Sequence, residues 1–429
     1  MAYTRRDFIR TAGVGAAVGT ATLAGCSVAP SAKKSAGRVV VIGAGYAGAT
    51  AAKYVRLLAP DIDVTMIEPG ELFISCPISN LVINGSKSLA DVSASFGALR
   101  SKYGIGFIRD TAVSIDVAKR EVRVTQSKEP IPYDRLIVAP GVQFVYDSIP
   151  GLRDSAAQEL ILHAWKAGAQ TVALRKQLVA MADGGVFAIH IPKAPYRCPP
   201  GPYERACLVA DYFRKAKPKS KVLILDSNDD VVSKKPLFTK IWKELYPDLI
   251  EYRPNSELID VDAVNRTIKL TFDDVKVDVL NVLPPMKAGK IAESAGLITA
   301  NNRWCEVDFL TYESKVAKNV HVLGDAILAA PAMPKSGHMA NGHGKNCAAA
   351  VVALIKNQPV NSNPMLTNTC YSFVTDKDVI HIASVHRYDD VKKTMVTVDG
   401  SGGLSTGATE LEGQFAFAWA KNIWADVLA

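Results

Sequence analysis

Short apolar runs bounded by glycine or proline alternate with amphipathic stretches along most of the chain, a pattern typical of an α/β protein. Near the start, residues 37–42 (Gly-Arg-Val-Val-Val-Ile) predict a buried parallel strand, and residues 49–58 predict a helix that ends before Pro60. Residues 63–68 (Asp-Val-Thr-Met-Ile-Glu) predict the next strand. Together these segments predict a complete βαβ unit.

The turn between the first strand and the helix contains three glycines, Gly43, Gly45 and Gly48, and the next strand ends at an acid, Glu68. Gly43 and Gly45 let the backbone approach a pyrophosphate, and the positive end of the helix attracts it. Glu68 follows Gly48 by 20 residues, the spacing of a carboxylate that holds ribose hydroxyls. The unit therefore predicts a dinucleotide site.

Two later segments resemble the remaining pieces of the FAD domain in flavoproteins that contain two dinucleotide-binding domains. Residues 133–141, which end at Gly141, are similar to the strand and turn that close the first part of such a domain. Residues 319–326 are similar to the strand and Gly-Asp pair, here Gly324 and Asp325, whose aspartate contacts the flavin ribityl chain. The separated pieces are therefore predicted to converge on one FAD.

A helix is predicted to follow the Gly-Asp pair. Residues 334–337 (Pro-Lys-Ser-Gly), which include Lys335, lead into a helix that runs through residues 348–355. The positive end of such a helix favours the flavin N1/O2 edge, where reduced flavin gathers negative charge. Lys335 is therefore a further candidate cofactor-binding residue.

The middle of the chain repeats the strand, helix, strand pattern without the glycine turn. Residues 185–192 and 221–226 predict strands, and residues 203–215 predict the helix between them. The turn at residues 192–202 is rich in proline, which lacks the N–H groups that bind a pyrophosphate and blocks the tight turn. This unit is predicted to keep the fold without a nicotinamide site, so the electron donor is predicted not to be a nicotinamide.

Composition places the chain among globular proteins of two or three domains, because 48% of its 429 residues are hydrophobic and 21% are charged. The formal net charge is +8, and half of that excess lies within residues 1–35. The remainder does not indicate a nucleic-acid partner.

The N-terminus has the pattern of a targeting segment. Residues 4–10 (Thr-Arg-Arg-Asp-Phe-Ile-Arg) resemble a twin-arginine export signal, and the apolar stretch at residues 11–25 is too short to span a bilayer. We therefore expect a periplasmic protein. Residues 23–26 also match a lipoprotein cleavage box, which would place a lipid on Cys26, and ordinary processing within residues 27–36 is the alternative. A membrane association is expected only if Cys26 is lipidated.

The fold class predicted by these patterns is α/β, with two Rossmann-like dinucleotide-binding domains arranged as in glutathione reductase and a smaller C-terminal domain. The predicted regions are an export signal and linker (1–35), the first part of the FAD-binding domain (36–150), the second Rossmann-like domain (151–284), the second part of the FAD-binding domain (285–358) and a C-terminal interface domain (359–429).

The seven cysteines form no Cys-x-x-Cys or Cys-x-x-Cys-His pattern, so neither a metal site nor an attached haem is predicted within the chain. Cys198 lies in the proline-rich turn, where a nicotinamide phosphate would otherwise approach. Reduction of a flavin by a thiol-like donor requires a sulfur relay with a second cysteine. The candidates are Cys370, Cys347, Cys305 and Cys207, of which Cys370 is the best partner because it lies in a polar segment.

The chain resembles the flavoprotein subunit of flavocytochrome c sulfide dehydrogenase from about residue 37 to the C-terminus, and the family is related to sulfide:quinone reductases. The most specific segment is residues 197–206 (Arg-Cys-Pro-Pro-Gly-Pro-Tyr-Glu-Arg-Ala). Further similarity lies at residues 163–168, 333–337 and 368–372.

The resemblance implies roles for individual residues. Cys198 and Cys370 would form a redox disulfide over the flavin, and Glu204 would be an acid/base group, although a carboxylate at a helix N-terminus also has a purely structural use. Cys76 matches the cysteine that binds the flavin covalently, and Trp419 matches an aromatic residue near the active site. Pro77 departs from the family pattern, in which an aromatic residue follows this cysteine.

The implied reaction is the oxidation of sulfide to sulfane sulfur. Hydrosulfide attacks Cys198, Cys370 leaves as the thiolate that reduces FAD, and the electrons pass to a separate c-type cytochrome subunit. The alternatives are a membrane-associated sulfide:quinone reductase, in which residues 414–424 form an amphipathic anchor, and a flavin-binding protein without catalysis. We favour a core or interface helix at residues 414–424, because its polar face lacks a Lys/Arg cluster.

Overall fold

The computed structural model describes residues 35–429. The predicted export signal and Cys26 lie outside the described residues. The first large sheet is parallel throughout, in the order β19-β9-β1-β2-β5. Its strands are β1 (Gly37–Ile42), β2 (Ile62–Ile67), β5 (Gly106–Ile108), β9 (Arg135–Val138) and β19 (Val320–Val322). Strands from the regions predicted as the two parts of the FAD domain thus share one sheet.

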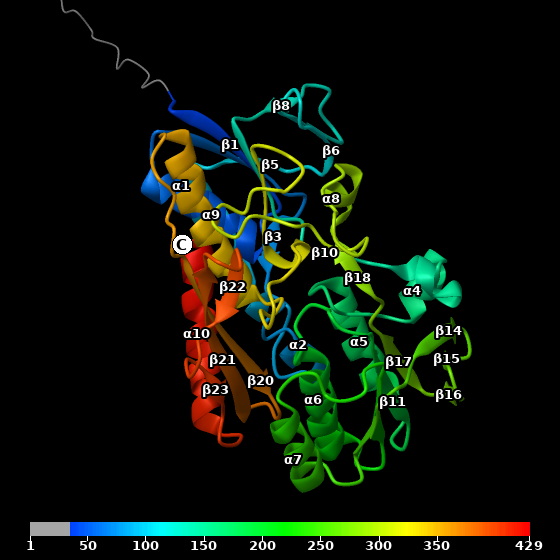
Figure 1. The fold of residues 1–429 in the computed structure, drawn as a ribbon. Coiled ribbons are helices and arrows are strands. Elements are labelled where there is room, and N and C mark those ends of the chain that lie inside the picture. The colour runs from blue at the N-terminus through cyan, green and yellow to red at the C-terminus, as the bar shows by residue number, and fades with distance from the viewer. Residues whose placement is uncertain (1–34) are drawn as a thin grey trace, which may run out of the picture. The chain divides into compact units, whose positions relative to one another are not determined.

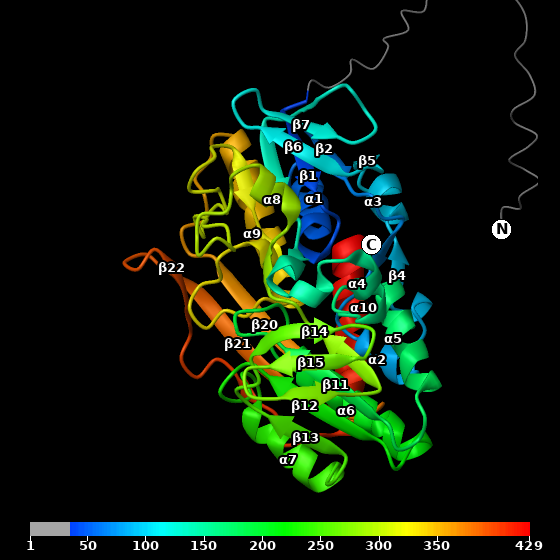
Figure 2. The same ribbon diagram turned by 90° about the vertical axis from the view of Figure 1, so that its right-hand side faces the viewer.

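Two helices pack against each other beside this sheet. Helix α1 (Tyr46–Leu58) begins shortly after β1. Helix α9 (Gly337–Ile355) follows β19 in the chain and lies along α1 (Figures 1 and 2). The two helices approach each other closely at Gly344, where an added Cβ would lie 2.6 Å from the carbonyl oxygen of Ala47. The N-termini of both helices are therefore fixed relative to the carboxyl ends of the strands.

The second sheet is also parallel, in the order β13-β12-β11-β17, and has the hydrophobic runs of a sheet covered on both faces. Its strands are β11 (Val186–Ile191), β12 (Lys221–Asp226), β13 (Ile250–Arg253) and β17 (Val279–Val282), and its helices are α5 (Ala169–Ala180), α6 (Gly201–Ala216) and α7 (Lys235–Leu245). The predicted α/β class with two Rossmann-like units is confirmed.

Smaller elements complete these two units. An antiparallel ribbon pairs β10 (Val142–Phe144) with β18 (Met286–Ala288). The others are β3 (Leu72–Ile74), β4 (Ser93–Ser95), β6 (Ala112–Asp116), β7 (Glu121–Val124), β8 (Ile131–Pro132), β14 (Leu258–Asp262), β15 (Thr267–Leu270), β16 (Asp274–Lys276), α2 (Asn80–Asn84), α3 (Gly97–Ser101), α4 (Ser155–Leu160) and α8 (Lys290–Ser294).

The C-terminal region is an antiparallel sheet covered by one helix. It contains β20 (Met365–Phe373), β21 (Val379–Asp389), β22 (Thr394–Thr397), β23 (Gly403–Leu404) and α10 (Glu410–Leu428). The buried face of α10 packs on α1 and β21, and Trp424 Nε1 donates a hydrogen bond to Tyr46 Oη (3.0 Å). This packing agrees with a core helix at residues 414–424. Among residues 35–429, no helix is long and apolar enough to cross a membrane.

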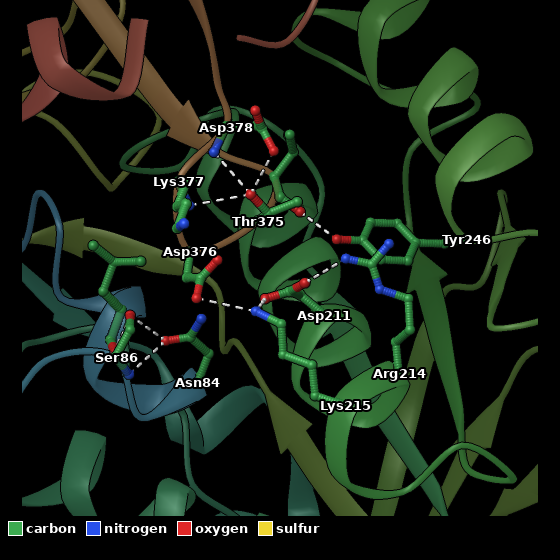
Figure 3. A network of polar contacts seen from close by, with 12 residues as sticks. Asn84, Ser86, Asp211, Arg214, Lys215, Tyr246, Thr375, Asp376, Lys377 and Asp378 are labelled. Atoms are coloured by element: carbon green, nitrogen blue, oxygen red, sulfur yellow. Dashed lines mark hydrogen bonds and ion pairs between the residues drawn. The ribbon is translucent and has the colours of Figure 1, made fainter. Parts of the chain in front are cut away.

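A polar network fixes the β20–β21 turn to the second Rossmann-like unit (Figure 3). Lys215 on α6 binds both Asp211 on the same helix (2.7 Å) and Asp376 in the turn (3.0 Å). Tyr246 donates to the carbonyl oxygen of Val374 (2.5 Å). These contacts hold β20 against α6, and this packing sets the position of Cys370 relative to the N-terminal turn of that helix.

We expect Asp211→Asn to lower the free energy of unfolding by about 1.5–3 kcal/mol, because the buried carboxylate accepts hydrogen bonds from two cations, Arg214 and Lys215. Asp376→Asn is the matched control, since its side chain is 35% exposed and its loss should cost less than about 1 kcal/mol. Urea unfolding of both variants measures the difference. Equal losses would show that the network is not organised around Asp211.

Candidate functional site

A cavity of about 660 Å³ lies where the two Rossmann-like units and the C-terminal sheet meet. This volume is typical of small-molecule and cofactor sites, which span about 300–1,000 Å³. Most of the residues singled out in the sequence line it. They are Gly43, Gly45, Glu68, Cys76, Gly141, Cys198, Glu204, Gly324, Asp325, Cys370 and Trp419.

The glycine turn after β1 is built for close backbone approach. Gly43 has a positive φ of 92°, and a Cβ there would lie 2.4 Å from the carbonyl oxygen of Ala139. Glu68 accepts hydrogen bonds from the backbone N–H groups of Ala44 and Gly70, both at 2.8 Å. The first turn of α1 has neither an acidic residue nor a side-chain cap, so its N–H groups are available to a phosphate.

The other end of the cavity is formed by Asp325 and the N-terminus of α9. Lys335 does not line this cavity, and its role in cofactor binding stays a prediction. Its ammonium donates to the carbonyl oxygens of Asp325 (3.0 Å) and Ile327 and lies over the Trp304 ring. Lys335 therefore holds the loop that presents Asp325. Gly48 also lies outside the cavity lining, where it packs against Gly43 in the turn.

Cys198 is held in an unusual backbone conformation at the end of the proline-rich turn. Its φ of 58° lies in the left-handed region, which is uncommon for a residue other than glycine. Its N–H donates to the carbonyl oxygen of Lys335, and its carbonyl oxygen accepts from Gly201, both at 2.9 Å. A Cβ on Gly201 would lie 2.8 Å from Cys198 Sγ, so a glycine is needed beside the sulfur.

Cys370 approaches the same cavity from β20. Its Sγ lies 3.4 Å from Asn368 Nδ2. Burial raises the pKa of Cys198, and the charge of Cys370 raises it further, so the two sulfurs interact electrostatically. Both cysteines carry free thiols in the structure, and the disulfide between them stays a prediction.

The competing pairings are less favourable. Cys207, Cys305 and Cys347 are fully buried, and none of the three lines the cavity. Cys207 lies in the core of the second Rossmann-like unit, and Cys347 lies in the core on α9. Among the four candidate partners of Cys198, only Cys370 reaches the cavity.

Glu204 lies in the first turn of α6 and is almost fully buried. Burial raises its pKa to about 7, while Lys234 and the N–H of Phe373, which donates to Oε1 (3.3 Å), oppose the increase. A carboxyl group with such a pKa exchanges protons readily near neutral pH. Glu204 is thus both a helix-terminal carboxylate and a candidate acid/base group.

Cys76 differs from the other cysteines of the cavity in its ionisation. Burial alone would raise the pKa of its thiol, but the Arg197 guanidinium and the N–H of Ala167 lower it below the ordinary value. The turn accommodates Pro77, because the Ser79 hydroxyl and N–H both donate to the carbonyl oxygen of Cys76, at 2.6 and 3.1 Å. The site therefore favours a Cys76 thiolate, the nucleophilic form of cysteine.

The second Rossmann-like unit uses its own acidic residue internally. Asp226 ends β12, where a nucleotide-binding unit would hold a ribose. Its buried carboxylate accepts hydrogen bonds from the hydroxyl groups of Tyr203 (2.6 Å) and Tyr252 (3.1 Å). Both the proline-rich turn and this carboxylate are unsuited to a nicotinamide dinucleotide.

Sequence reasoning missed two charged residues near the cysteines, Arg197 and Lys234. Arg197 precedes the cysteine of the most specific segment, and a cation next to a reactive cysteine was a signal that was available. Lys234 lies in a polar Ser-Lys-Lys-Pro segment that is typical of an exposed loop, so no pattern indicated its burial.

Three segments match known protein families. Residues 37–188 match the pyridine nucleotide-disulphide oxidoreductases. Residues 171–284 match the central region of the sulfide dehydrogenase [flavocytochrome c] flavoprotein chain, and residues 362–428 match the flavin-binding region of flavocytochrome c sulphide dehydrogenase.

Individual relatives agree with these families. A sulfide dehydrogenase [flavocytochrome c] flavoprotein chain of Chlorobaculum thiosulfatiphilum is 56% identical over 45 residues, which are 10% of this chain and 94% of that sequence. The mitochondrial sulfide:quinone oxidoreductase of Mus musculus is 26% identical over 307 residues, which are 67% of this chain. The match covers 65% of the mouse protein, which is less than two thirds of its length. The fold is similar to the crystal structure of the Aquifex aeolicus sulfide:quinone oxidoreductase, with a TM-score of 0.73, 20% identity and 91% of each chain covered.

We expect Gly48→Ala to weaken flavin binding at least roughly fivefold, because overpacking costs about 1–3 kcal/mol. A Cβ at this position would lie 1.9 Å from the carbonyl oxygen of Gly43, so the turn would have to open. Gly403→Ala is the control, since no atom lies within 4 Å of the added Cβ. The ratio of flavin to protein absorbance after dialysis is the readout, and an unchanged ratio in Gly48→Ala would contradict the assignment of the turn.

Proposed function

The chain belongs to the family of flavocytochrome c sulfide dehydrogenase flavoprotein chains, related to sulfide:quinone reductases, and on this premise we propose that it oxidises hydrosulfide through a Cys198–Cys370 disulfide and a bound FAD. The observation that carries the proposal is that both cysteines line the same cavity as the glycine turn after β1. Glu204, the predicted acid/base group, lines it as well.

The residues of the cavity fit FAD. The uncapped N–H groups of α1 suit a pyrophosphate, Glu68 lies at the end of β2 where ribose hydroxyls are held, and Asp325 is presented beside the N-terminus of α9. The positive end of α9 favours a ring that accumulates negative charge on reduction. When bound there, FAD supplies the acceptor for an electron pair.

The chain's own residues carry the sulfur chemistry. Hydrosulfide forms a bond to Cys198 Sγ, the bond between the two cysteine sulfurs breaks, and its electron pair stays on Cys370 Sγ as a thiolate. The product on Cys198 is a persulfide. Glu204, with a pKa of about 7, accepts the persulfide proton, and a second sulfur nucleophile then removes the sulfane sulfur.

The electron acceptor proposed for the reduced protein is a c-type cytochrome subunit. Support comes from the two matched families, which are both described as flavocytochrome c sulfide dehydrogenases, and from the packing of α10 in the core. A quinone is the second candidate, because the mouse relative is a sulfide:quinone oxidoreductase. Sulfide-dependent reduction of ubiquinone in detergent, with no reduction of cytochrome c, would favour the quinone.

We also propose export to the periplasm, on the twin-arginine pattern at residues 4–10.

Replacing either cysteine of the proposed disulfide should abolish flavin reduction by sulfide. We expect Cys198→Ser and Cys370→Ser each to slow bleaching of the flavin band by more than about a thousandfold, because each removes half of a relay that works as a unit. Dithionite should still bleach both variants. Cys347→Ala, outside the cavity, is the control, and anaerobic stopped-flow absorbance is the measurement. Rapid bleaching in both Ser variants would exclude the relay.

We further propose that Cys76 binds FAD covalently, supported by the lowered pKa of its thiol beside Arg197. In Cys76→Ala the flavin should be released completely on denaturation, whereas the wild-type chain should stay fluorescent on a denaturing gel. Arg197→Met should slow attachment, because it removes the cation that lowers the pKa of the Cys76 thiol, and Arg197→Lys should retain most of the rate. Wild-type flavin that is released on denaturation would refute the covalent bond.

A further inference from the structure

Lys234 is a buried cation that the mechanism above does not use. Only 3% of its surface is exposed, although lysine is almost never fully buried. It precedes α7 and has a φ of 55°, in the left-handed region. Its Nζ donates to the carbonyl oxygen of Cys370 (2.6 Å), the Ser372 hydroxyl (2.8 Å) and the carbonyl oxygen of Ile380 (3.3 Å). All three acceptors are uncharged.

Four acidic groups from different parts of the chain act on this ammonium. In decreasing order of influence they are Cys370 on β20, Glu204 on α6, Cys198 in the proline-rich turn and Glu412 on α10. Burial lowers the pKa of Lys234 to about 8, and these four acidic groups oppose the decrease. The ionisation of either sulfur of the proposed disulfide therefore acts on the buried ammonium.

The influence is mutual. Burial raises the pKa of Cys370, and the Lys234 ammonium is the largest of the effects that lower it. While the disulfide is intact, neither sulfur is charged. When it opens, one negative charge appears on a partly buried sulfur, where a fixed positive charge has a greater effect than it would have in bulk water.

We propose that Lys234 is the positioning residue that stabilises the thiolate of Cys370 when the disulfide opens. The inference rests on the proposed Cys198–Cys370 relay. Through its hydrogen bond to the Cys370 backbone, Lys234 holds β20 at the site, and its charge makes Cys370 the better leaving group, because a less basic thiolate leaves faster. Lys234 keeps its proton throughout, so the atom and electron balance of the relay is unchanged.

The alternative is a structural role, in which Lys234 only ties the β20–β21 hairpin to the second Rossmann-like unit. The electrostatic role requires the positive charge of Lys234, whereas the structural role requires only its hydrogen bonds. Lys234→Arg keeps the positive charge, whereas Lys234→Gln keeps a hydrogen-bond donor without it. Lys217→Gln is a matched control, because Lys217 is also buried and its Nζ likewise donates to two backbone carbonyl oxygens, those of Val179 and Met181.

The test measures the ionisation of Cys370 directly. The FAD-loaded protein is reduced anaerobically and alkylated with iodoacetamide at pH 7, below the pKa of about 8 of Lys234, and the rate of alkylation of the Cys370 peptide is measured by mass spectrometry. In Lys234→Gln we expect this rate to be about tenfold lower, because the neutral side chain no longer stabilises the thiolate. Lys234→Arg and Lys217→Gln should keep the wild-type rate.

An unchanged rate of alkylation in a folded Lys234→Gln variant would overturn the proposal, and so would a Lys234→Arg rate that matches that of Lys234→Gln. Lys234→Met, which keeps the apolar stem, serves as a second neutral variant should the glutamine variant not fold. Because alkylation involves no sulfide, this result is independent of whether sulfide reduces the flavin. Failure of the sulfide relay and failure of the Lys234 role are therefore distinguishable.

Discussion

The packing of β20 on α6 is the constraint on which the rest of the site depends. Cys198 and Cys370 are 172 positions apart in the chain, and Cys198 lies in the turn between β11 and α6 whereas Cys370 lies on β20. They share a cavity because the turn after β20 is fixed to the C-terminal half of α6 (Figure 3), while Cys198 lies shortly before the N-terminus of that helix. One rigid helix therefore sets the positions of both sulfurs, and a hydrogen bond from Cys198 to Lys335 ties the pair to the FAD-type unit.

Burial at this junction disfavours charged side chains, and nearby cations offset this effect to a different degree at each cysteine. Desolvation raises the pKa of every thiol in the cavity and of Glu204. At Cys76 the guanidinium of Arg197 overcomes desolvation and the pKa of the thiol is lowered. At Cys370 the influence of Lys234 only moderates the increase. The same cavity thus lowers the pKa of one thiol, Cys76, and raises the pKa of another, Cys370.

Patterns in the sequence were sufficient for the fold and for most of the cavity lining. The βαβ unit at residues 37–68 and the segments around Gly141 and Asp325 predicted one dinucleotide site, because such sites form at the carboxyl ends of neighbouring parallel strands. The place of Lys335 in the chain does not reveal that its ammonium would bind backbone carbonyl oxygens. Lys234 was missed because only the tertiary packing of β20 and β21 makes a Ser-Lys-Lys-Pro loop part of the interior. Local patterns do not report which charges become buried together.

The scarcity of phosphate-binding N–H groups in the proline-rich turn and the presentation of Cys198 follow from the same local change. In a nucleotide-binding unit the turn after the first strand uses glycines to reach positive φ and to expose N–H groups to phosphate. Here prolines remove those donors, and a cysteine occupies the left-handed position with a φ of 58°. Its N–H donates to Lys335 and is not left for an anion. The conformation that leaves few N–H groups for a phosphate is the one that places a sulfur in the cavity. The second Rossmann-like unit therefore contributes a cysteine from the turn at which units of this fold bind a dinucleotide.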